Sequence, residues 1–438
     1  MPYIGLAKKF LDTNNIKEWD IVKIYLDDFS LVAVILPGPE TENHIYLKLR
    51  NGYNIAYKVT KIRKIEKIGE IKPKYTLPGM RMIIKKELPT VTILHCGGTI
   101  ASKVEYSTGA IAPAFSPEEL SYAIPEIFDL AKINTRELIN IFSENMMPEH
   151  WINIATNIEK EFHNDARGII VTHGTDTLHF TASAIAFMLE NLPGPIVFTG
   201  AMRSSDRPAS DAAVNMISSV RFATSSSVGE SVIVMHANPD DTSCFAHRSV
   251  RCIKLHSCRR DAFRSIGISP IALINNKKIS YLTNEFIPIS TNKDDLLSNP
   301  VFENKTALVY IYPGFPSEIL ETLIDHKFRG IVLVGTGLGH TPDSLMPVIR
   351  RGIQESIIIV MTTQCLWGGV FMNVYETGRK LLRIGVIPAH TMLPHVAYVK
   401  LGWLLGQGIS KQDILELIQK DLRREFVQKE KVDSFVCQ

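Results

Sequence analysis

Two short motifs place glycine and threonine directly after apolar runs. The run TVTILHC leads into Gly97, Gly98 and Thr99, and the run RGIIVTHG leads into Thr175 and Asp176. A threonine hydroxyl at a strand end can attack a carbonyl carbon, and backbone N–H groups near the glycines can stabilise the resulting oxyanion. Threonine needs a base for this attack, which a neighbouring carboxylate or a lysine from elsewhere could supply. The motifs therefore indicate nucleophilic chemistry on a carbonyl group.

Each motif taken alone also has a purely structural interpretation. GGT after a strand is common in tight turns, and HGTDT at a strand–helix junction could be a helix N-cap formed by Thr175 or Asp176. The two motifs occur in order on successive parts of one α/β unit, and together they favour a functional site. Neither motif decides between Thr99 and Thr175 as the nucleophile.

The elements that would position these motifs are alternating strands and helices. From residue 90, apolar strand-like runs alternate with helical segments, which predicts α/β domains with mostly parallel sheets. Ligands bind at the carboxyl ends of such strands. We expect one α/β domain over 90–285 and a second over 300–438, the latter ending in an amphipathic helix in DILELIQKDLRREFVQK.

The N-terminal part of the chain has a different pattern. Residues 1–75 contain short β-rich stretches separated by turn signals, including Asn51-Gly52, and predict a small all-β barrel. Residues 76–89 contain prolines and lysines and are expected to form a linker.

Positive charge is concentrated near the N-terminus. Residues 1–88 contain 16 Lys/Arg and 10 Asp/Glu, a balance of +6 within a net charge of +3, so the remainder carries −3. Most of the excess falls in the stretch 58–86. This stretch forms either a solvated strand face with its linker or a surface that contacts RNA phosphate or an acidic partner.

Composition narrows the class of protein. Hydrophobic residues make up 45% of the chain and charged residues 21%, which is typical of a globular protein. No apolar run is long enough to span a bilayer, and the first residues show no signal-peptide pattern, so no membrane contact is expected. The six cysteines form no CxxC or zinc-like spacing, which predicts reduced thiols, a cytoplasmic protein and no metal site.

Beyond these patterns, the chain resembles a known family. HCGGTIAS and VTHGTDTLHFTASAI are similar to the two active-site signatures of the type I/II L-asparaginases, and the similarity spans roughly residues 90–425. The β-rich extension and the segment KLHSCRRDAF resemble the D subunits of archaeal glutamyl-tRNA(Gln) amidotransferases. The resemblance implies an α/β fold, namely an asparaginase-like two-domain core with mostly parallel sheets preceded by the small β barrel.

Catalytic roles follow from this resemblance position by position. Thr99 matches the first catalytic threonine, the usual candidate nucleophile, and Thr175 matches the second. Asp176 and Lys254 match the two residues that form a relay with the second threonine in the family.

Substrate-binding roles follow in the same way. Ser143 matches the serine that binds the substrate α-carboxylate, and Glu144 follows it where the family often has a polar residue. Asp176 is also expected to receive the α-ammonium group, and Tyr106 matches the mobile-loop tyrosine. Cys96 departs from the usual threonine, for which we expect only a change in packing.

The resemblance also implies a function and partners. It implies a glutaminase subunit that releases ammonia from glutamine or asparagine for a partner, the E subunit, in a heterodimer that forms a dimer of heterodimers. Because the chain has no GxxxxGK[ST] loop, no cofactor is expected here, and ATP and Mg²⁺ would be used by the partner, which would also make most contacts to Glu-tRNA(Gln). The alternatives are a free-standing L-asparaginase and an inactive binding module. The presence of Thr99, Thr175, Asp176 and Lys254 together argues against the inactive module.

Overall fold

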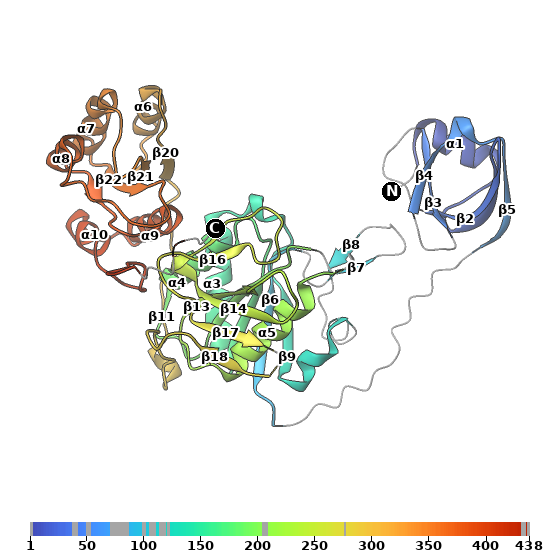
Figure 1. Ribbon diagram of the computed structural model, residues 1–438, viewed down its shortest axis with the longest axis horizontal. Helices are drawn as coiled ribbons and strands as arrows, with labels where there is room; N and C mark the ends of the chain where they lie inside the picture. Colours follow the sequence, from blue (N-terminus) through green and yellow to red (C-terminus); the bar gives the residue numbers. More distant parts are fainter. Residues whose placement is uncertain are drawn as a thin grey trace. The chain divides into compact units, whose positions relative to one another are not determined.

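The chain forms two structural units (Figure 1). The first unit comprises Met1–Met82 and Ser102–Ala114, and the second comprises Ile83–Ala101 and Phe115–Gln438. The structure is a computed structural model. It describes residues 3–36, 43–49, 54–70, 87–98, 102–104, 111–113, 120, 123–203, 209–275, 277–430 and 435. Residues 76–86 of the predicted linker at 76–89 lie outside the described residues.

The first unit is built on a five-stranded antiparallel sheet of order β4-β3-β2-β1-β5. Inward residues alternate with outward ones, so side chains such as Val22, Ile35 and Leu47 are fully buried. The bounds of its elements are α1 Gly5–Thr13, β1 Asp20–Tyr25, β2 Ser30–Leu36, β3 His44–Leu49, β4 Asn54–Lys58 and β5 Lys64–Glu70. A further antiparallel pair, β7 (Ser102–Val104) and β8 (Ile111–Pro113), belongs to the same unit.

Helix α1 is an addition to the predicted all-β unit. Ala7 and Leu11 lie four residues apart and are buried, together with Tyr3, against the inner face of the sheet. The Tyr3 hydroxyl also accepts a hydrogen bond from the Tyr46 N–H at 3.0 Å. This spacing of apolar residues is a short helical pattern, and it is the signal that would have revealed the helix.

The described part of the basic N-terminal stretch is largely ion-paired. Lys64 pairs with Glu66 at 2.5 Å, and Lys67 pairs with the buried carboxylate of Asp20 at 2.6 Å. These pairs fit a solvated strand face, because neutralised lysines contribute little to phosphate binding. Contact with RNA stays an untested alternative for the stretch as a whole.

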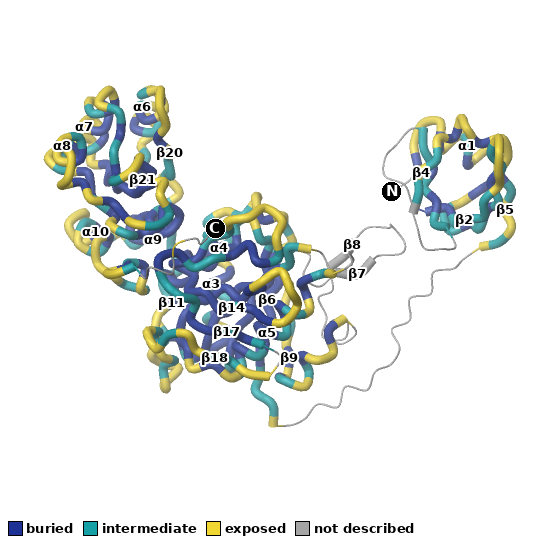
Figure 2. Tube along the Cα trace, viewed as in Figure 1, coloured by how far each residue is buried: buried dark blue, intermediate teal, exposed yellow. Residues whose placement is uncertain are grey.

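The second unit begins with an eight-stranded mixed sheet of order β18-β17-β14-β13-β12-β10-β6-β9. The five strands from β9 to β13 in this order are parallel, whereas β14, β17 and β18 pair antiparallel. The central strands are buried along their whole length, as in parallel sheets covered on both faces (Figure 2). The bounds of the strands are β6 Thr90–His95, β9 Lys132–Glu137, β10 Gly168–Thr172, β12 Ile196–Thr199, β13 Ser231–His236, β14 Ser243–Arg248, β17 Ala272–Asn275 and β18 Ile279–Tyr281.

Among the residues that the structure describes, three α-helices accompany this sheet. Helices α4 and α5 pack against its parallel strands, and α3 packs on β10 and α4. The bounds of these helices are α3 Pro148–His163, α4 Leu178–Met188 and α5 Ala212–Ser225. The predicted α/β alternation is confirmed for this domain.

The C-terminal domain contains a parallel sheet of order β20-β21-β22-β23. Helix α9 is apolar on nearly all sides because it packs between this sheet and α4 of the preceding domain. No helix among the described residues has the length and apolar character needed to cross a membrane. The bounds of the elements are β20 Thr306–Tyr310, α6 Ser317–Asp325, β21 Gly330–Gly335, α7 Met346–Gln354, β22 Ile358–Thr363, α8 Glu376–Ile384, β23 Ile387–Pro388, α9 Pro394–Gly406 and α10 Lys411–Leu417.

The final helix is shorter than predicted. Instead of running through DILELIQKDLRREFVQK, α10 ends at Leu417, and the following residues form an irregular segment. The reason is the buried ammonium group of Lys400, which donates to the Ile418 carbonyl at 3.1 Å and to the Glu425 carboxylate at 2.6 Å. The Ile418 carbonyl, which a continuing helix would use internally, is therefore bonded to a buried cation.

This buried ion pair generates a stability prediction. Replacing Lys400→Met leaves the Glu425 carboxylate buried without its cation and should lower the free energy of unfolding by about 3–5 kcal/mol. Denaturant unfolding measures the loss. The double variant Lys400→Met, Glu425→Gln is the control. It removes both charges and should therefore recover most of the lost free energy of unfolding. Equal losses in the single and double variants would show that the unpaired charge is not the cause.

Candidate active site

The two threonine motifs leave neighbouring strands at the same edge of the eight-stranded sheet. Strands β6 and β10 are parallel neighbours with His95 opposite Thr172, the last residue of each strand. The Cys96 N–H then donates to the Thr172 carbonyl at 2.9 Å. Carboxyl ends of adjacent parallel strands form the usual ligand-binding edge of an α/β sheet, so the chain places both motifs where a substrate could bind.

The turn after β6 requires glycine at both of its first positions. Gly97 and Gly98 have φ values of +97° and +84°, a region that other residues rarely adopt. A β-carbon on Gly98 would lie 2.9 Å from the His173 carbonyl carbon, and one on Gly97 would overlap the Ile141 carbonyl oxygen. The glycines therefore let the first motif approach the second motif and the loop after β9.

Two of the predicted site residues cannot be placed. Thr99 and Tyr106 lie outside the described residues, which follow the first motif only as far as Gly98. Cys96, two residues before Gly98, is buried, and burial raises the pKa of its thiol well above the usual range. Its neutral thiol packs as a small apolar group.

The other predicted catalytic residues are brought together. The Lys254 Nζ donates to the Thr175 Oγ1 at 2.8 Å and to the Asp176 Oδ1 at 2.7 Å. The Lys254 side chain is 8% exposed, whereas that of Asp176 is 69% exposed. The amine therefore lies beneath the surface, 79 residues after Thr175 in the sequence, and bonds both the Thr175 hydroxyl and the solvent-facing Asp176 carboxylate.

The loop after β9 supplies two of the predicted substrate-binding residues, Ser143 and Glu144. Ser143 is buried, and its carbonyl accepts a hydrogen bond from the Thr177 hydroxyl at 2.6 Å. A β-carbon on Gly174 would lie 2.8 Å from the Ser143 β-carbon, so the missing side chain allows the loop to pack against the second motif. Glu144 is exposed beside Ser143, in the 3₁₀ turn Ser143–Asn145. The structure therefore places Ser143 next to the second motif and Glu144 at the surface.

Buried neutral histidines surround the second motif. Burial is the main cause that lowers the pKa of His95, His173 and His179 to about 4 in each case. His173 must carry its proton on Nδ1, because that atom lies 2.7 Å from the Gly174 carbonyl, which can only accept. Its Nε2 then accepts from the Thr181 hydroxyl at 2.9 Å.

Sequence reasoning did not identify these histidines as part of the site. His173 sits between the end of β10 and Gly174, and its hydrogen bonds hold the turn that precedes Thr175. The available signal was a histidine at a strand end immediately before a glycine–threonine motif. The sequence alone could not show that the ring is buried.

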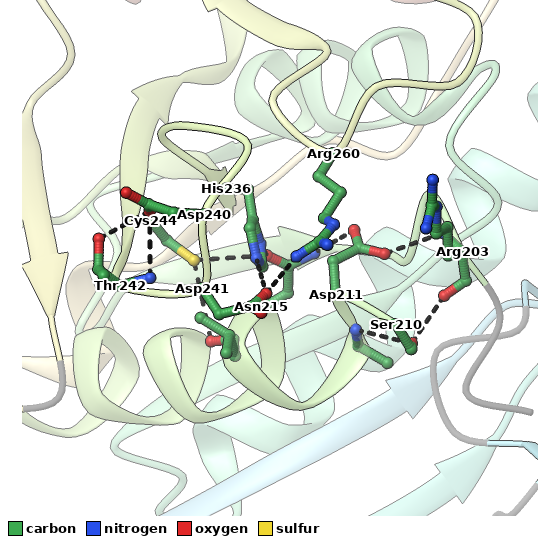
Figure 3. Close-up of polar contacts among 12 residues, drawn as sticks. Arg203, Ser210, Asp211, Asn215, His236, Asp240, Asp241, Thr242, Cys244 and Arg260 are labelled. Carbon is green, nitrogen blue, oxygen red and sulfur yellow. Dashed lines mark hydrogen bonds and ion pairs between the residues drawn. The ribbon is translucent and has the colours of Figure 1, made fainter. Parts of the chain in front are cut away.

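A polar network lies at the same edge of the sheet, around the ends of β12 and β13 (Figure 3). Arg260 forms an ion pair with Asp241, and the buried ring of His236 bonds Asp241 through Nε2 at 3.3 Å and Asn215 through Nδ1 at 2.6 Å. The Asp211 carboxylate continues the network by accepting from the Asn215 amide at 2.9 Å. Arg260 lies at the tip of a hairpin formed by β15 (Cys252–Lys254) and β16 (Phe263–Ser265), which carries Lys254, so the network holds this tip against the domain core.

The arrangement has the parts needed for nucleophilic attack on a carbonyl. A hydroxyl, an amine and a carboxylate lie in hydrogen-bond contact, which allows a proton to pass between a threonine and the lysine. Within the described ranges, no group of His, Cys, Asp and Glu side chains is arranged to hold a metal ion.

The glycine turn yields a testable prediction. Gly98→Ala should lower the free energy of unfolding by about 1–2 kcal/mol from its positive φ and by about 1–3 kcal/mol more from overlap with His173. Gly314→Ala is a matched control, since Gly314 has φ +81° but no atom within 4 Å of the place that a β-carbon would take. Thermal or denaturant unfolding of both variants measures the difference. Equal losses would mean that the overlap with His173 does not contribute to the loss of free energy of unfolding.

Comparison with protein families matches three parts of the chain. Residues 90–286 match the family model described as Asparaginase, N-terminal, and residues 305–418 match the Glutaminase/Asparaginase C-terminal domain. Residues 16–68 match the GatD N-terminal domain.

Individual relatives agree with this assignment. The chain is 44% identical over 436 residues to the glutamyl-tRNA(Gln) amidotransferase D subunit of Pyrococcus abyssi, covering 98% of this chain and 99% of that protein. It is 42% identical to the D subunit of Methanothermobacter thermautotrophicus, covering 99% and 100%. Among solved structures, the thermostable L-asparaginase from Thermococcus kodakarensis matches with a TM-score of 0.68 and 30% identity, covering 78% of this chain and all of that one. The chain therefore belongs to the family of glutamyl-tRNA(Gln) amidotransferase D subunits, which share the asparaginase fold.

Proposed function

We propose that the chain is the glutamine-hydrolysing subunit of a tRNA-dependent amidotransferase that converts Glu-tRNA(Gln) to Gln-tRNA(Gln). The observation that carries this proposal is the position of the Lys254 Nζ, within hydrogen-bond distance of both Thr175 and Asp176. Relatives that cover nearly the whole chain, including its N-terminal unit, support the amidotransferase context.

The proposed reaction begins when Thr99 or Thr175 attacks the γ-carbonyl carbon of glutamine. The relay of Lys254 and Asp176 accepts the hydroxyl proton and returns it to the leaving nitrogen, so that the C–N bond breaks and ammonia departs. Water then hydrolyses the ester and releases glutamate. Asparagine would react in the same way through its own side-chain amide.

Substrate binding in this proposal uses the groups around the second motif. The exposed carboxylate of Asp176 pairs with the substrate α-ammonium, and Ser143 binds its α-carboxylate. Tyr106 and Glu144 complete the substrate contacts. The closeness of Ser143 to Gly174 supports this role, because it places the serine beside the proposed relay.

Partners belong to the same proposal. Ammonia is expected to pass to the E subunit, which uses ATP and Mg²⁺ to activate the glutamate on Glu-tRNA(Gln) and makes most of the tRNA contacts. The assembly is expected to be a dimer of heterodimers in the cytoplasm, and this chain itself is expected to need no cofactor.

A free-standing L-asparaginase is the second candidate. It is favoured by the similarity of 78% of the chain to complete asparaginases, including L-asparaginase I from Vibrio cholerae at 26% identity and a TM-score of 0.67. Unlike the relatives among the amidotransferase D subunits, these structures leave the remaining part of the chain unmatched.

The two candidates differ in their dependence on a partner. Glutamine hydrolysis should be slow for the purified chain and should rise at least tenfold when the E subunit, ATP, Mg²⁺ and Glu-tRNA(Gln) are all present. Ammonia release and formation of Gln-tRNA(Gln) are measured together. Rapid asparagine hydrolysis that does not respond to these additions would support the free-standing asparaginase instead.

The relay is tested separately in the full assembly. Lys254→Met should lower kcat for glutamine by about 10²–10⁴-fold, the usual range for loss of a general acid–base group. Lys277→Met is the control, since Lys277 is an exposed lysine in the turn between β17 and β18 of the same domain. Retention of full activity by Lys254→Met would remove the lysine from the mechanism.

A further inference from the structure

Lys254 is carried by a small hairpin rather than by the main sheet. Strand β15 (Cys252–Lys254) pairs antiparallel with β16 (Phe263–Ser265), and these two strands form a sheet of their own. The position of the amine relative to Thr175 therefore depends on what holds the two ends of this hairpin.

The tip of the hairpin is held within its own domain. Arg260 pairs with Asp241, which contacts the buried ring of His236 (Figure 3). Burial on its own would raise the pKa of the Asp241 carboxyl, but its contacts with His236 and Arg260 outweigh this and lower the pKa. The tip is thus anchored by a charged pair that uses no residue of the C-terminal domain.

The base of the hairpin is held by Arg251, three residues before Lys254. The Arg251 side chain is fully buried, and its Nε and Nη2 donate to the Ile266 carbonyl at 3.0 and 2.6 Å. The Ile266 N–H donates to the Arg251 carbonyl at 2.8 Å. Arg251 therefore closes the hairpin where its two strands begin and end.

The third guanidinium nitrogen reaches the C-terminal domain. Arg251 Nη1 donates to the Thr391 carbonyl at 2.5 Å and to the Glu425 carbonyl at 3.2 Å. Glu425 lies in the irregular stretch Lys420–Glu430, which we call the C-terminal segment. One side chain thus joins the hairpin of Lys254 to the C-terminal segment.

The C-terminal segment is itself fixed around this arginine. The Thr391 Oγ1 accepts from the Val427 N–H at 2.7 Å and donates to the Val427 carbonyl at 3.2 Å. A β-carbon on Gly267, which has φ +74°, would lie 2.9 Å from Arg251 Nη2 and 3.2 Å from a Glu430 carboxylate oxygen. Glycine at this position lets the segment pack directly over the guanidinium.

Charge at the junction favours this arrangement. Burial lowers the pKa of Arg251 to about 10, partly opposed by the Glu430 carboxylate, so the guanidinium stays charged at neutral pH. A buried cation that has carbonyl oxygens as its hydrogen-bond acceptors is costly to leave unpaired. Displacement of the C-terminal segment would therefore disturb Arg251 and, with it, the base of the hairpin.

From these contacts we propose that Arg251 is a positioning residue through which the C-terminal segment holds Lys254 in hydrogen-bond contact with Thr175. This rests on the proposed role of Lys254 in amide hydrolysis. A buried arginine with a purely structural role would affect stability alone, whereas a positioning residue affects the chemical step through Lys254.

The test compares variants at the two ends of the connection in the full assembly with the E subunit. Arg251→Lys keeps the positive charge but cannot reach all three carbonyls, and Thr391→Val removes the hydroxyl that ties the C-terminal segment without touching the hairpin. Each should lower kcat for glutamine, Arg251→Lys by ~10²-fold, since a misplacement of about 1 Å can cost that much. KM should change less than kcat does, because the variants leave the Ser143 loop in place and affect Asp176 only through its contact with Lys254.

Arg248→Lys is the matched control. Arg248 is a buried arginine three residues earlier in the chain, and it donates to the Glu230 carboxylate at 2.7 Å and to the Glu285 carbonyl, both in its own domain. It should lose stability but keep kcat at temperatures well below unfolding. If Arg251→Lys lowers kcat no more than Arg248→Lys does, the proposal is overturned.

A double variant separates positioning from structure. If Arg251 acts through Lys254, adding Arg251→Lys to Lys254→Met should cause no further loss of the residual kcat. A multiplicative loss would overturn the proposal. Should Arg251→Lys fail to fold, Thr391→Val with and without Lys254→Met gives the same comparison. Full activity of Lys254→Met alone would refute the relay itself, whereas a large loss there with normal kcat in Arg251→Lys and Thr391→Val would refute only the positioning role.

Discussion

The proposed site depends above all on the contact between the Lys254 amine and two residues of the second threonine motif. Lys254 reaches Thr175 and Asp176 from a separate hairpin, and its side chain is nearly buried while the carboxylate faces solvent. A proton relay depends on hydrogen-bond distances that vary by only a few tenths of an ångström. The parallel strands, the glycine turns and the hairpin anchors all act on this distance.

The sheet contributes the first part of this geometry through simple topology. Because β6 and β10 are parallel neighbours, the residues that follow them leave from one edge, and glycines at 97, 98 and 174 let the backbones come close. The surrounding histidines are buried and neutral at neutral pH. They therefore place no additional positive charge beside the lysine.

Local patterns in the sequence were enough to predict the α/β alternation and the mostly parallel sheets, and they indicated that the threonines would need a base. They were not enough where long-range hydrogen bonds override local preference. The amphipathic pattern after Asp413 predicted a long final helix, but Lys400 takes the Ile418 and Lys420 carbonyls, and α10 ends at Leu417. Lys254 was found only through family resemblance, since no spacing rule links it to a motif 79 residues away.

The contacts of Arg251 also set an order of events in biosynthesis. Its partners Thr391 and Glu425 lie 140 and 174 residues later in the chain. A ribosome makes a protein from its N-terminus, and domains generally fold in that order. Thr99, Thr175, Asp176 and Lys254 are therefore synthesised long before the Thr391 and Glu425 carbonyl groups that bond Arg251 at the base of the Lys254 hairpin. If the proposed positioning role is correct, a nascent chain can contain all of the proposed catalytic side chains before the C-terminal segment that bonds Arg251 has been made.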